Sequence, residues 1–312
     1  MIARATREGL AAARRTPRLA VTLWLVNLTL ALAAGVPGWL SLQSAIGELP
    51  GADALGDGFR FGVLRDLVEM RPGLLAGLFL SAAGVACLGL LLGAATTGGA
   101  LEVLMSRDDR PFAHRFGRGA GRFFVRFVRA GLLAGVLGAL AAAVLAGPLF
   151  ALSGRLRRES GAEIATHLVA TGAVLVAGLA VLLALLALDA ARIRIVREDS
   201  PRVLPLVRSG LAVVLGHPVK WLGTWGVNAL LGALALGLYL AFRDTVPAGT
   251  GPLILLMAVA QQAFVLVRSW LRVALFGSEM ALVDRLRPLL VAPSPVAPAP
   301  PQPAGEPEPP PA

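Results

Sequence analysis

The chain has 312 residues, of which 56% are hydrophobic and 15% are charged, and its formal net charge is +10. An average soluble domain has about a quarter of its residues charged, so this composition excludes an ordinary soluble domain and indicates a membrane protein. The basic residues lie between long apolar runs, as in the loops of membrane proteins. The positive charge therefore does not indicate nucleic-acid binding.

Six apolar runs, each bounded by charge, Pro or Gly, follow one another along the chain. They lie near residues 19–42, 73–101, 130–152, 168–188, 221–242 and 253–276. Each reaches about the 20 residues that an α-helix needs to cross a bilayer, where a helix satisfies its own backbone hydrogen bonds. The sequence therefore predicts an all-α, polytopic transmembrane domain over residues 1–287, with six transmembrane helices.

The first run also has features of a secretory signal peptide, because a basic start precedes an apolar stretch that ends in Ala-Leu-Ala. Its apolar character continues through "VPGWLSL", to about 24 residues, whereas a signal core has about 7–15. This length favours an uncleaved first span.

The distribution of basic residues predicts the orientation in the membrane. The two termini and the loops 102–129 and 189–220 hold 20 Lys and Arg, whereas the three alternate loops hold 7. The positive-inside rule then places both termini in the cytoplasm. The chain has 28 Arg and one Lys in an Ala-, Leu- and Gly-rich sequence, a composition typical of GC-rich bacterial genomes, so we expect a bacterial inner membrane.

Two segments outside the spans have their own character. Residues 288–312 hold 11 of the 22 prolines, which predicts a disordered, proline-rich cytoplasmic tail. In the outer loop 47–72, apolar residues recur at helical spacing, which predicts a short helix on the outer surface.

The sequence contains an internal repeat. A shift of 201 residues superimposes residues 7–27 on 208–228 without a gap, and the matches include Pro, Trp and Asn. These three matches are Pro17/Pro218, Trp24/Trp225 and Asn27/Asn228. A second shift, of 90 residues, relates the middle of the chain to its end and places Asp189 on Glu279. We therefore predict three copies of one unit, in which an amphipathic segment precedes a helical hairpin.

The opening segment of the middle unit, residues 112–129, alternates aromatic and basic residues. Its phenylalanines recur at spacings of four, seven and four, with arginines beside them. Such a face suits an interfacial helix in the headgroup layer, with its arginines on anionic phospholipid phosphates. A connector that only joins two spans fits the same pattern.

The last span carries a polar stripe. At 100° per residue, its members lie within about 20° of one line along the helix. They are Gln261, Arg268, Arg272 and Glu279. One hypothesis is that Arg268 and Arg272 line a cavity and hold an anion; the preferred one is that they pair with Asp189 and Glu102, carboxylates expected at similar depth.

Two asparagines, Asn27 and Asn228, occupy equivalent positions in the first helices of two units. Asn side chains inside a membrane commonly make hydrogen bonds between helices. That role is the first interpretation, and a ligand site is the second.

Catalytic and metal-binding motifs are missing from the sequence. It has no histidine pair at metal-ligand spacing, no Gly-x-Ser-x-Gly, no phosphate-binding Gly-rich loop and no Cys-x-x-Cys. We therefore expect no catalytic residue, no cofactor and no metal.

The segment "LDAARIRIVREDSP" (188–201), with the hairpin before it, resembles a group of bacterial integral membrane proteins. These are akin to the membrane domain fused to some glycerophosphodiester phosphodiesterases, which has about six helices with basic amphipathic connectors. The resemblance covers roughly residues 5 to 287. It implies a membrane domain without the soluble catalytic domain, and it carries over no active-site residue.

Two functions fit this sequence. The first is a non-enzymatic accessory or regulatory module of the inner membrane, whose partners are the lipid bilayer and anionic headgroups. The second is a small transporter or lipid- or anion-binding protein that uses an Arg268/Arg272 cavity, since internal repeats are common in transporters.

Overall fold

The protein is all-α. The computed structural model describes residues 1–46, 72–106, 108–159, 163–246 and 251–286. The helices are α1 (Ile2–Arg15), α2 (Pro17–Ile46), α4 (Pro72–Met105), α5 (Phe112–Glu159), α6 (Glu163–Glu198), α7 (Val203–Gly216), α8 (Pro218–Thr245) and α9 (Gly251–Leu286). The loop 47–71 and the tail 288–312, for which an outer helix and disorder are predicted, lie outside these residues.

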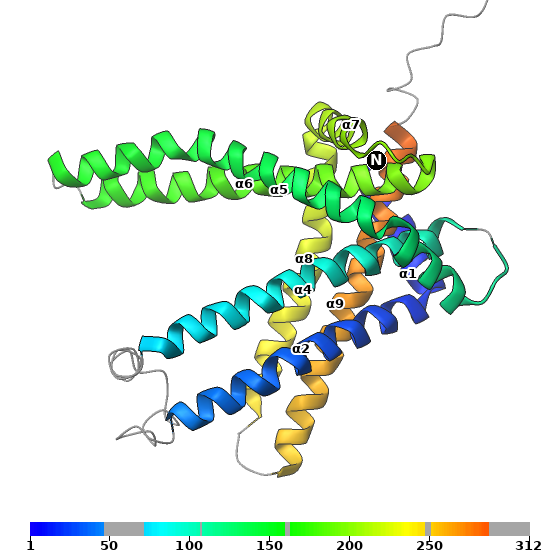
Figure 1. Cartoon of the computed structure of the whole chain (residues 1–312), viewed down its shortest axis with the longest axis horizontal. Coiled ribbons are helices and arrows are strands. Elements are labelled where there is room, and N and C mark those ends of the chain that lie inside the picture. Colours follow the sequence, from blue (N-terminus) through cyan, green and yellow to red (C-terminus); the bar gives the residue numbers. More distant parts are fainter. Residues whose placement is uncertain (47–71, 107, 160–162, 247–250, 287–312) are drawn as a thin grey trace, which may run out of the picture.

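Six of the helices are long and apolar enough to span a membrane, and each overlaps one predicted span. They form three hairpins, α2/α4, α5/α6 and α8/α9, which diverge towards their turns (Figure 1). Large apolar side chains on these helices are exposed, for example Leu90 and Leu175. Lipid is the solvent in which such surfaces are stable, so the prediction of an all-α, multi-pass membrane protein is confirmed.

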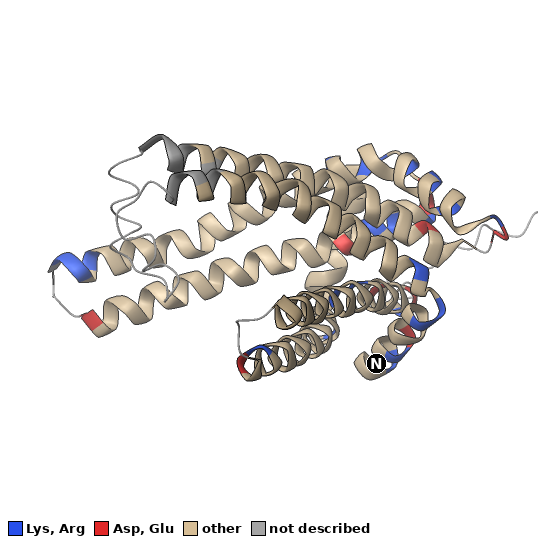
Figure 2. Ribbon diagram, turned by 90° about the horizontal axis from the view of Figure 1, so that it is seen from below, with Lys and Arg blue, Asp and Glu red and all other residues tan. Residues whose placement is uncertain are grey.

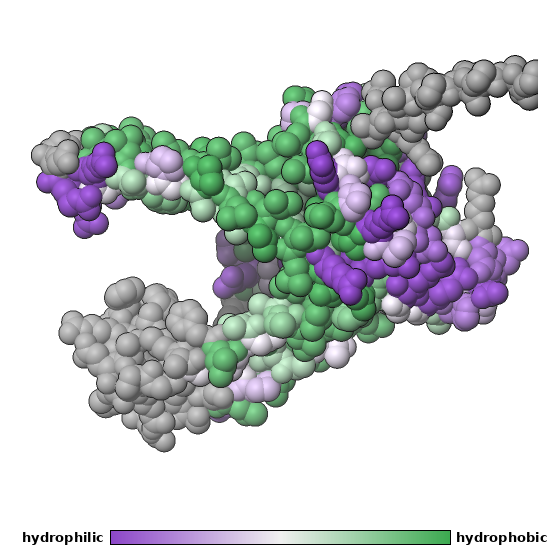
Figure 3. Space-filling model, turned by 45° about the horizontal axis from the view of Figure 1, so that its top comes forward, coloured by the Kyte–Doolittle hydropathy of each residue, from purple (hydrophilic) through white to green (hydrophobic). Residues whose placement is uncertain are grey.

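The opposite ends of the hairpins gather into one packed region, which we call the base. It comprises α1, α7, residues 112–130 of α5 and the last turns of α4, α6 and α9. The largest fully buried side chains here include Phe123, Phe127, Ile193 and Leu282. Charged residues concentrate at this end of the ribbon (Figure 2). The α5/α6 hairpin that leaves it is covered mostly by apolar side chains, with polar ones near its far end (Figure 3).

Helix breaks in the base follow the positions of proline. α1 ends at Arg15 and α7 at Gly216. One residue follows each of them before α2 and α8 start at Pro17 and Pro218. Proline lacks the N–H that would continue the preceding helix, yet its φ suits a first helical position. The breaks are 201 residues apart, as the sequence repeat requires.

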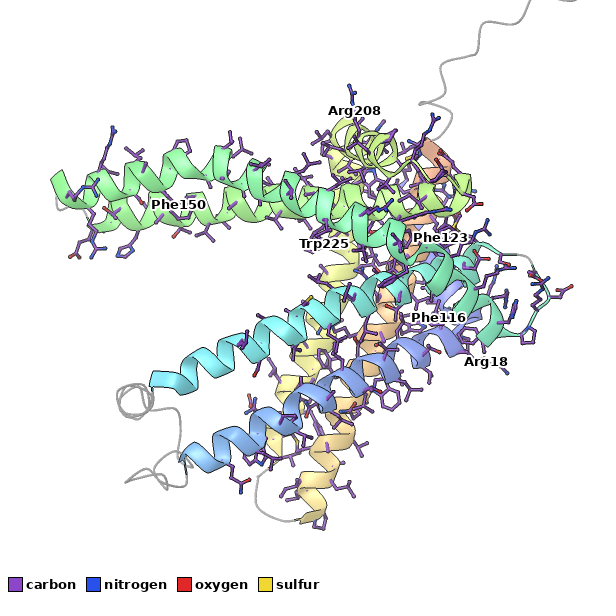
Figure 4. All side chains as sticks on the ribbon, viewed as in Figure 1. Arg18, Phe116, Phe123, Phe150, Arg208 and Trp225 are labelled. Atoms are coloured by element: carbon purple, nitrogen blue, oxygen red, sulfur yellow. The ribbon has the colours of Figure 1, made fainter. Side chains whose placement is uncertain are left out.

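The middle unit has no such proline, so its opening segment is continuous with its span. α5 is 48 residues long, about 72 Å at 1.5 Å per residue, against a hydrocarbon core of about 30 Å. Phe123 and Phe127 are 1% and 0% exposed and pack inside the protein. The predicted headgroup-facing aromatic surface is therefore wrong; Phe116 and Phe123 lie where α5 crosses α4 (Figure 4).

The three units form a closed ring in the base. Each opening segment packs against the second span of the preceding unit: α5 on α4, α7 on α6, and α1 on α9. Each opening segment has one glycine where a side chain would collide with the neighbouring helix. These are Gly119 against Gly98 and Glu102, Gly210 against Ala187 and Ala191, and Gly9 against Ala274 and Ser278. The close backbone approach is thus repeated three times, which gives the base a pseudo-threefold arrangement.

Ion pairs connect neighbouring units around this ring. Arg285 at the end of α9 lies 2.5 Å from Glu8 of α1, and Arg197 of α6 pairs with Asp284 of α9. Asp199, between α6 and α7, pairs with Arg122 and Arg126 of α5. The hydrogen bond from Arg126, together with the charge of Arg122, holds the pKa of the Asp199 carboxyl below its usual range.

Candidate functional site

The polar stripe of α9 divides into an open part and a buried part. Arg268 and Arg272 are exposed and line a cavity, whereas Glu279, two turns further on, is only 1% exposed. Gln261 is exposed at the other end of the stripe. The helical spacing therefore placed the two arginines correctly on one face, but the four polar side chains of the stripe do not form a single cluster.

The cavity has a volume of about 810 Å³ and lies between the first and the third hairpin. α2, α4, α8 and α9 all contribute to its wall. Its polar lining consists of Asn27, Thr96, Thr97, Trp225, Asn228, Arg268, Ser269 and Arg272. Asn27 follows Pro17 by ten residues, about 15 Å along α2, so this polar layer lies well inside the span.

Both cavity arginines lack a carboxylate partner among the described residues. Glu102 pairs instead with Arg118 of α5 at 2.5 Å, and Asp189 pairs with Arg192 of its own helix at 3.0 Å. The prediction that these carboxylates neutralise Arg268 and Arg272 is therefore wrong. The physical reason is the base packing, since Gly119 brings α5 against Glu102 and an arginine lies one turn after Asp189.

Arg272 has an aromatic contact in place of an ion pair. Its guanidinium lies 4.7 Å from the ring centroid of Phe276, which stands one turn further along α9 and also lines the cavity. This distance suits a cation–π interaction, which orients the side chain without neutralising its charge. The cavity therefore contains two positive charges.

The two asparagines lie on the cavity wall. Asn228 is buried; its amide nitrogen donates to the Thr224 carbonyl of the same helix at 3.0 Å. Its Oδ1 accepts no hydrogen bond from any described residue. The first interpretation, an interhelical bond, is thus wrong for Asn228, and the repeat places Asn27 and Asn228 around one space.

A tryptophan connects α2 to α9 beside this cavity. The indole nitrogen of Trp24 donates to Oε1 of Gln262 at 3.1 Å. Its counterpart Trp225, on the part of α8 nearer to the base (Figure 4), lines the cavity itself. Sequence reasoning identified both tryptophans in the repeat without assigning them a role.

Glu279 lies outside the cavity wall, on the side of α9 that faces α1 and α6. The matched close contacts of Gly9 and Gly210 relate Ala274 to Ala187, a shift of 87 residues where the sequence suggested 90. The counterpart of Glu279 is therefore Arg192, and Asp189 corresponds to Phe276. The equivalence of Asp189 and Glu279 is corrected accordingly.

The chemistry available in the cavity is that of binding. The described residues that line it include no Asp, Glu, His or Cys, and they supply two guanidinium groups, two amides and several hydroxyls. No group of three or more His, Cys, Asp or Glu in the described ranges could hold a metal ion. Guanidinium groups bind phosphate and carboxylate through paired hydrogen bonds.

Comparison with protein-family models, with curated proteins and with solved structures finds no match for this chain. The resemblance drawn from residues 188–201 therefore stays a prediction.

Proposed function

We propose that this chain is a multi-pass protein of a bacterial inner membrane, with both termini in the cytoplasm, that binds a phosphate-like anion through Arg268 and Arg272. The anion is either the headgroup of an anionic phospholipid or a free oxyanion, because the two share the same charged oxygens. Binding in this cavity can serve transport or regulation.

The observation that carries this proposal is the unpaired state of the two arginines. An arginine inside a membrane span costs about 2.5–3.5 kcal/mol on insertion scales, and paired intramembrane charges reduce that cost. Arg268 and Arg272 lie on a cavity wall and make no ion pair with a carboxylate of the described residues. Arg118, Arg122 and Arg285 in the base do have such partners. A bound anion would supply the missing charge.

The test is native mass spectrometry of the full chain with phosphatidylglycerol, which is anionic, and phosphatidylcholine, which is zwitterionic. Arg268→Ala/Arg272→Ala should reduce retention of phosphatidylglycerol by more than about tenfold, since hydrogen bonds to charged groups contribute about 1.5–3 kcal/mol each. Arg122→Ala/Arg126→Ala removes the same charge from the base and is the matched control.

A titration with sulfate separates the two sources of anion. Displacement of the lipid by sulfate indicates one shared site, binding of lipid alone indicates a headgroup site, and binding of sulfate alone indicates a free oxyanion. Equal loss of binding in both double variants would contradict specific binding of the anion by the cavity arginines.

Localisation has its own test. Reporter fusions at residues 115 and 205 should give a cytoplasmic signal, and a fusion at residue 160 an external one. A cytoplasmic signal at residue 160 would contradict the proposed orientation.

A further inference from the structure

Glu279 is a buried carboxyl group for which the described fold provides no hydrogen bond. The residue is 1% exposed, and neither Oε1 nor Oε2 accepts a hydrogen bond from any described residue. A buried ionised carboxylate without a hydrogen-bonded partner is strongly unfavourable. The two other buried carboxylates among the described residues, in contrast, each bond to an arginine. These are Glu102 with Arg118 and Asp189 with Arg192.

The groups around Glu279 are of both charges. α6 contributes Asp189 and Arg192, and α9 itself contributes Arg272. α1 packs on the same stretch of α9 through the uncharged Gly9, while its Glu8 pairs with Arg285. The Glu102 carboxylate of α4 is paired with Arg118.

Asp189 and Glu279 compete for the same positive charge. Arg192 lies 3.0 Å from Asp189 and is its hydrogen-bonded partner. The charge of Arg192 therefore stabilises an ionised Asp189 more than an ionised Glu279. Two neighbouring carboxyl groups in a water-poor site do not both ionise readily. Glu279 is therefore the member of the pair that has no hydrogen-bonded arginine.

Arg272 connects this carboxyl pair to the cavity. Its side chain lines the cavity over the Phe276 ring, and its charge also acts on Glu279 seven residues further along α9. One guanidinium thus faces both a prospective anion and a buried carboxyl group. An anion that engages Arg272 reduces the positive charge available to Glu279.

We infer that Glu279, with Asp189 beside it, is a proton-binding site that Arg272 couples to the anion cavity, so that a proton and the anion bind together. The inference rests on the proposed anion binding. When the anion binds, the Glu279 carboxylate takes a proton from a hydronium ion of the solvent, so that one O–H bond forms on the carboxyl group, one O–H bond of hydronium breaks, and a water molecule is left. Because such coupling is reciprocal, lower pH strengthens anion binding.

The experiment measures the affinity of the purified full chain for sulfate as a function of pH. Sulfate is the probe because, unlike phosphate, it does not titrate near neutral pH. Full coupling makes the affinity of the wild type rise by up to about tenfold for each unit that pH falls. Glu279→Gln, which cannot exchange a proton, should bind sulfate with little dependence on pH.

Glu102→Gln is the matched control, since it removes another buried carboxylate of the base whose partner does not line the cavity. It should keep the pH dependence of the wild type. An equal pH dependence in wild type and Glu279→Gln overturns the coupling but leaves anion binding intact. Absence of sulfate and lipid binding in the wild type overturns the proposed function and the coupling with it.

Infrared difference spectroscopy gives an independent measurement of the proton. Addition of sulfate should increase the carbonyl stretch of a protonated carboxylic acid in the wild type, and this band should be missing in Glu279→Gln. A band that persists unchanged in Glu279→Gln would exclude Glu279 as the proton acceptor, whatever the affinities show.

Discussion

Four arginines of the base and the two arginines of the cavity differ in their carboxylate partners. Arg118 and Arg285 each lie 2.5 Å from a carboxylate of a neighbouring helix. Arg122 and Arg126 both pair with Asp199. Arg268 and Arg272 lie deeper in the span and make no ion pair with a carboxylate within the described ranges. The charge of an arginine is therefore neutralised where the arginine connects two repeats, whereas the arginines that line the cavity have no carboxylate partner.

This difference separates a structural use of arginine from a ligand-binding one. Removing one partner of a neutralised pair leaves a buried opposite charge, which costs stability. Removing an unpaired arginine leaves no orphaned group and relieves the cost of its insertion. Stability and binding should therefore respond in opposite ways to substitutions in the two regions.

The largest effect on stability should come from closing the space between helices of the base. Gly119→Leu forces a side chain into the backbone of Gly98, whereas Gly117, two residues earlier in α5, has nothing within 4 Å of a Cβ atom. Overpacking costs about 1–3 kcal/mol, so Gly119→Leu should unfold at a clearly lower temperature. Gly117→Leu should unfold like the wild type; equal losses in both variants would contradict the ring packing.

Arg118→Leu and Arg268→Leu compare the two classes of arginine directly. The first leaves the buried Glu102 carboxylate without its arginine, which should lower the free energy of unfolding and the melting temperature. The second should leave thermal stability unchanged or raise it. A matching loss in Arg268→Leu would reveal a structural pair for Arg268 and would weaken the binding proposal.

A smaller effect is expected at the contact between α2 and α9. Trp24→Phe removes the donor to Gln262 and should cost about 0.6 kcal/mol, the average for hydrogen bonds between transmembrane helices. Trp225→Phe, at the equivalent position of the third repeat, removes no hydrogen bond recorded for the described residues and is the control. Denaturation followed by circular dichroism measures both, and an equal change in each would assign the effect to ring size alone.

The smallest effect concerns pH and the exposed Asp199. Because its pKa is lowered in the folded protein, its contribution is present above the unfolded value of about 3.8 and is lost as pH falls through the folded value. Asn accepts the positive φ of 45° at this position, so Asp199→Asn removes only the charge. The variant should melt slightly below the wild type at pH 7, and the difference should vanish in acid; a difference that persists in acid would contradict the ion pair.

Much of the fold was predictable because each signal is local. Apolar length fixes the spans, and Pro17 and Pro218 mark the breaks at which α1 and α7 end. The lack of a proline between the opening segment and the span of the middle copy could also have predicted the continuous α5. The alternation of Phe and Arg in α5 does not reveal which face is buried, since a lipid-facing and a protein-facing aromatic stripe have the same period.

The site was predictable only in part. Helical spacing put Arg268 and Arg272 on one face, and the repeat singled out Asn27 and Asn228, all four of which line the cavity. Partners across helices depend on register, and a slip of three residues turns a helix by only about 60°. Matching apolar faces therefore could not distinguish a shift of 87 from one of 90, which misplaced Asp189 relative to Glu279.

The most direct test of the account is protection of a cysteine placed in the cavity. In a Cys87→Ser background, Ala229→Cys puts a thiol on the wall and keeps both arginines. A hydrophilic thiol reagent should label it, and sulfate or phosphatidylglycerol should slow the labelling. When Arg268→Ala/Arg272→Ala is added to the same protein, neither anion should change the labelling rate. A labelling rate that neither anion changes in the protein with both arginines would contradict anion binding in this cavity.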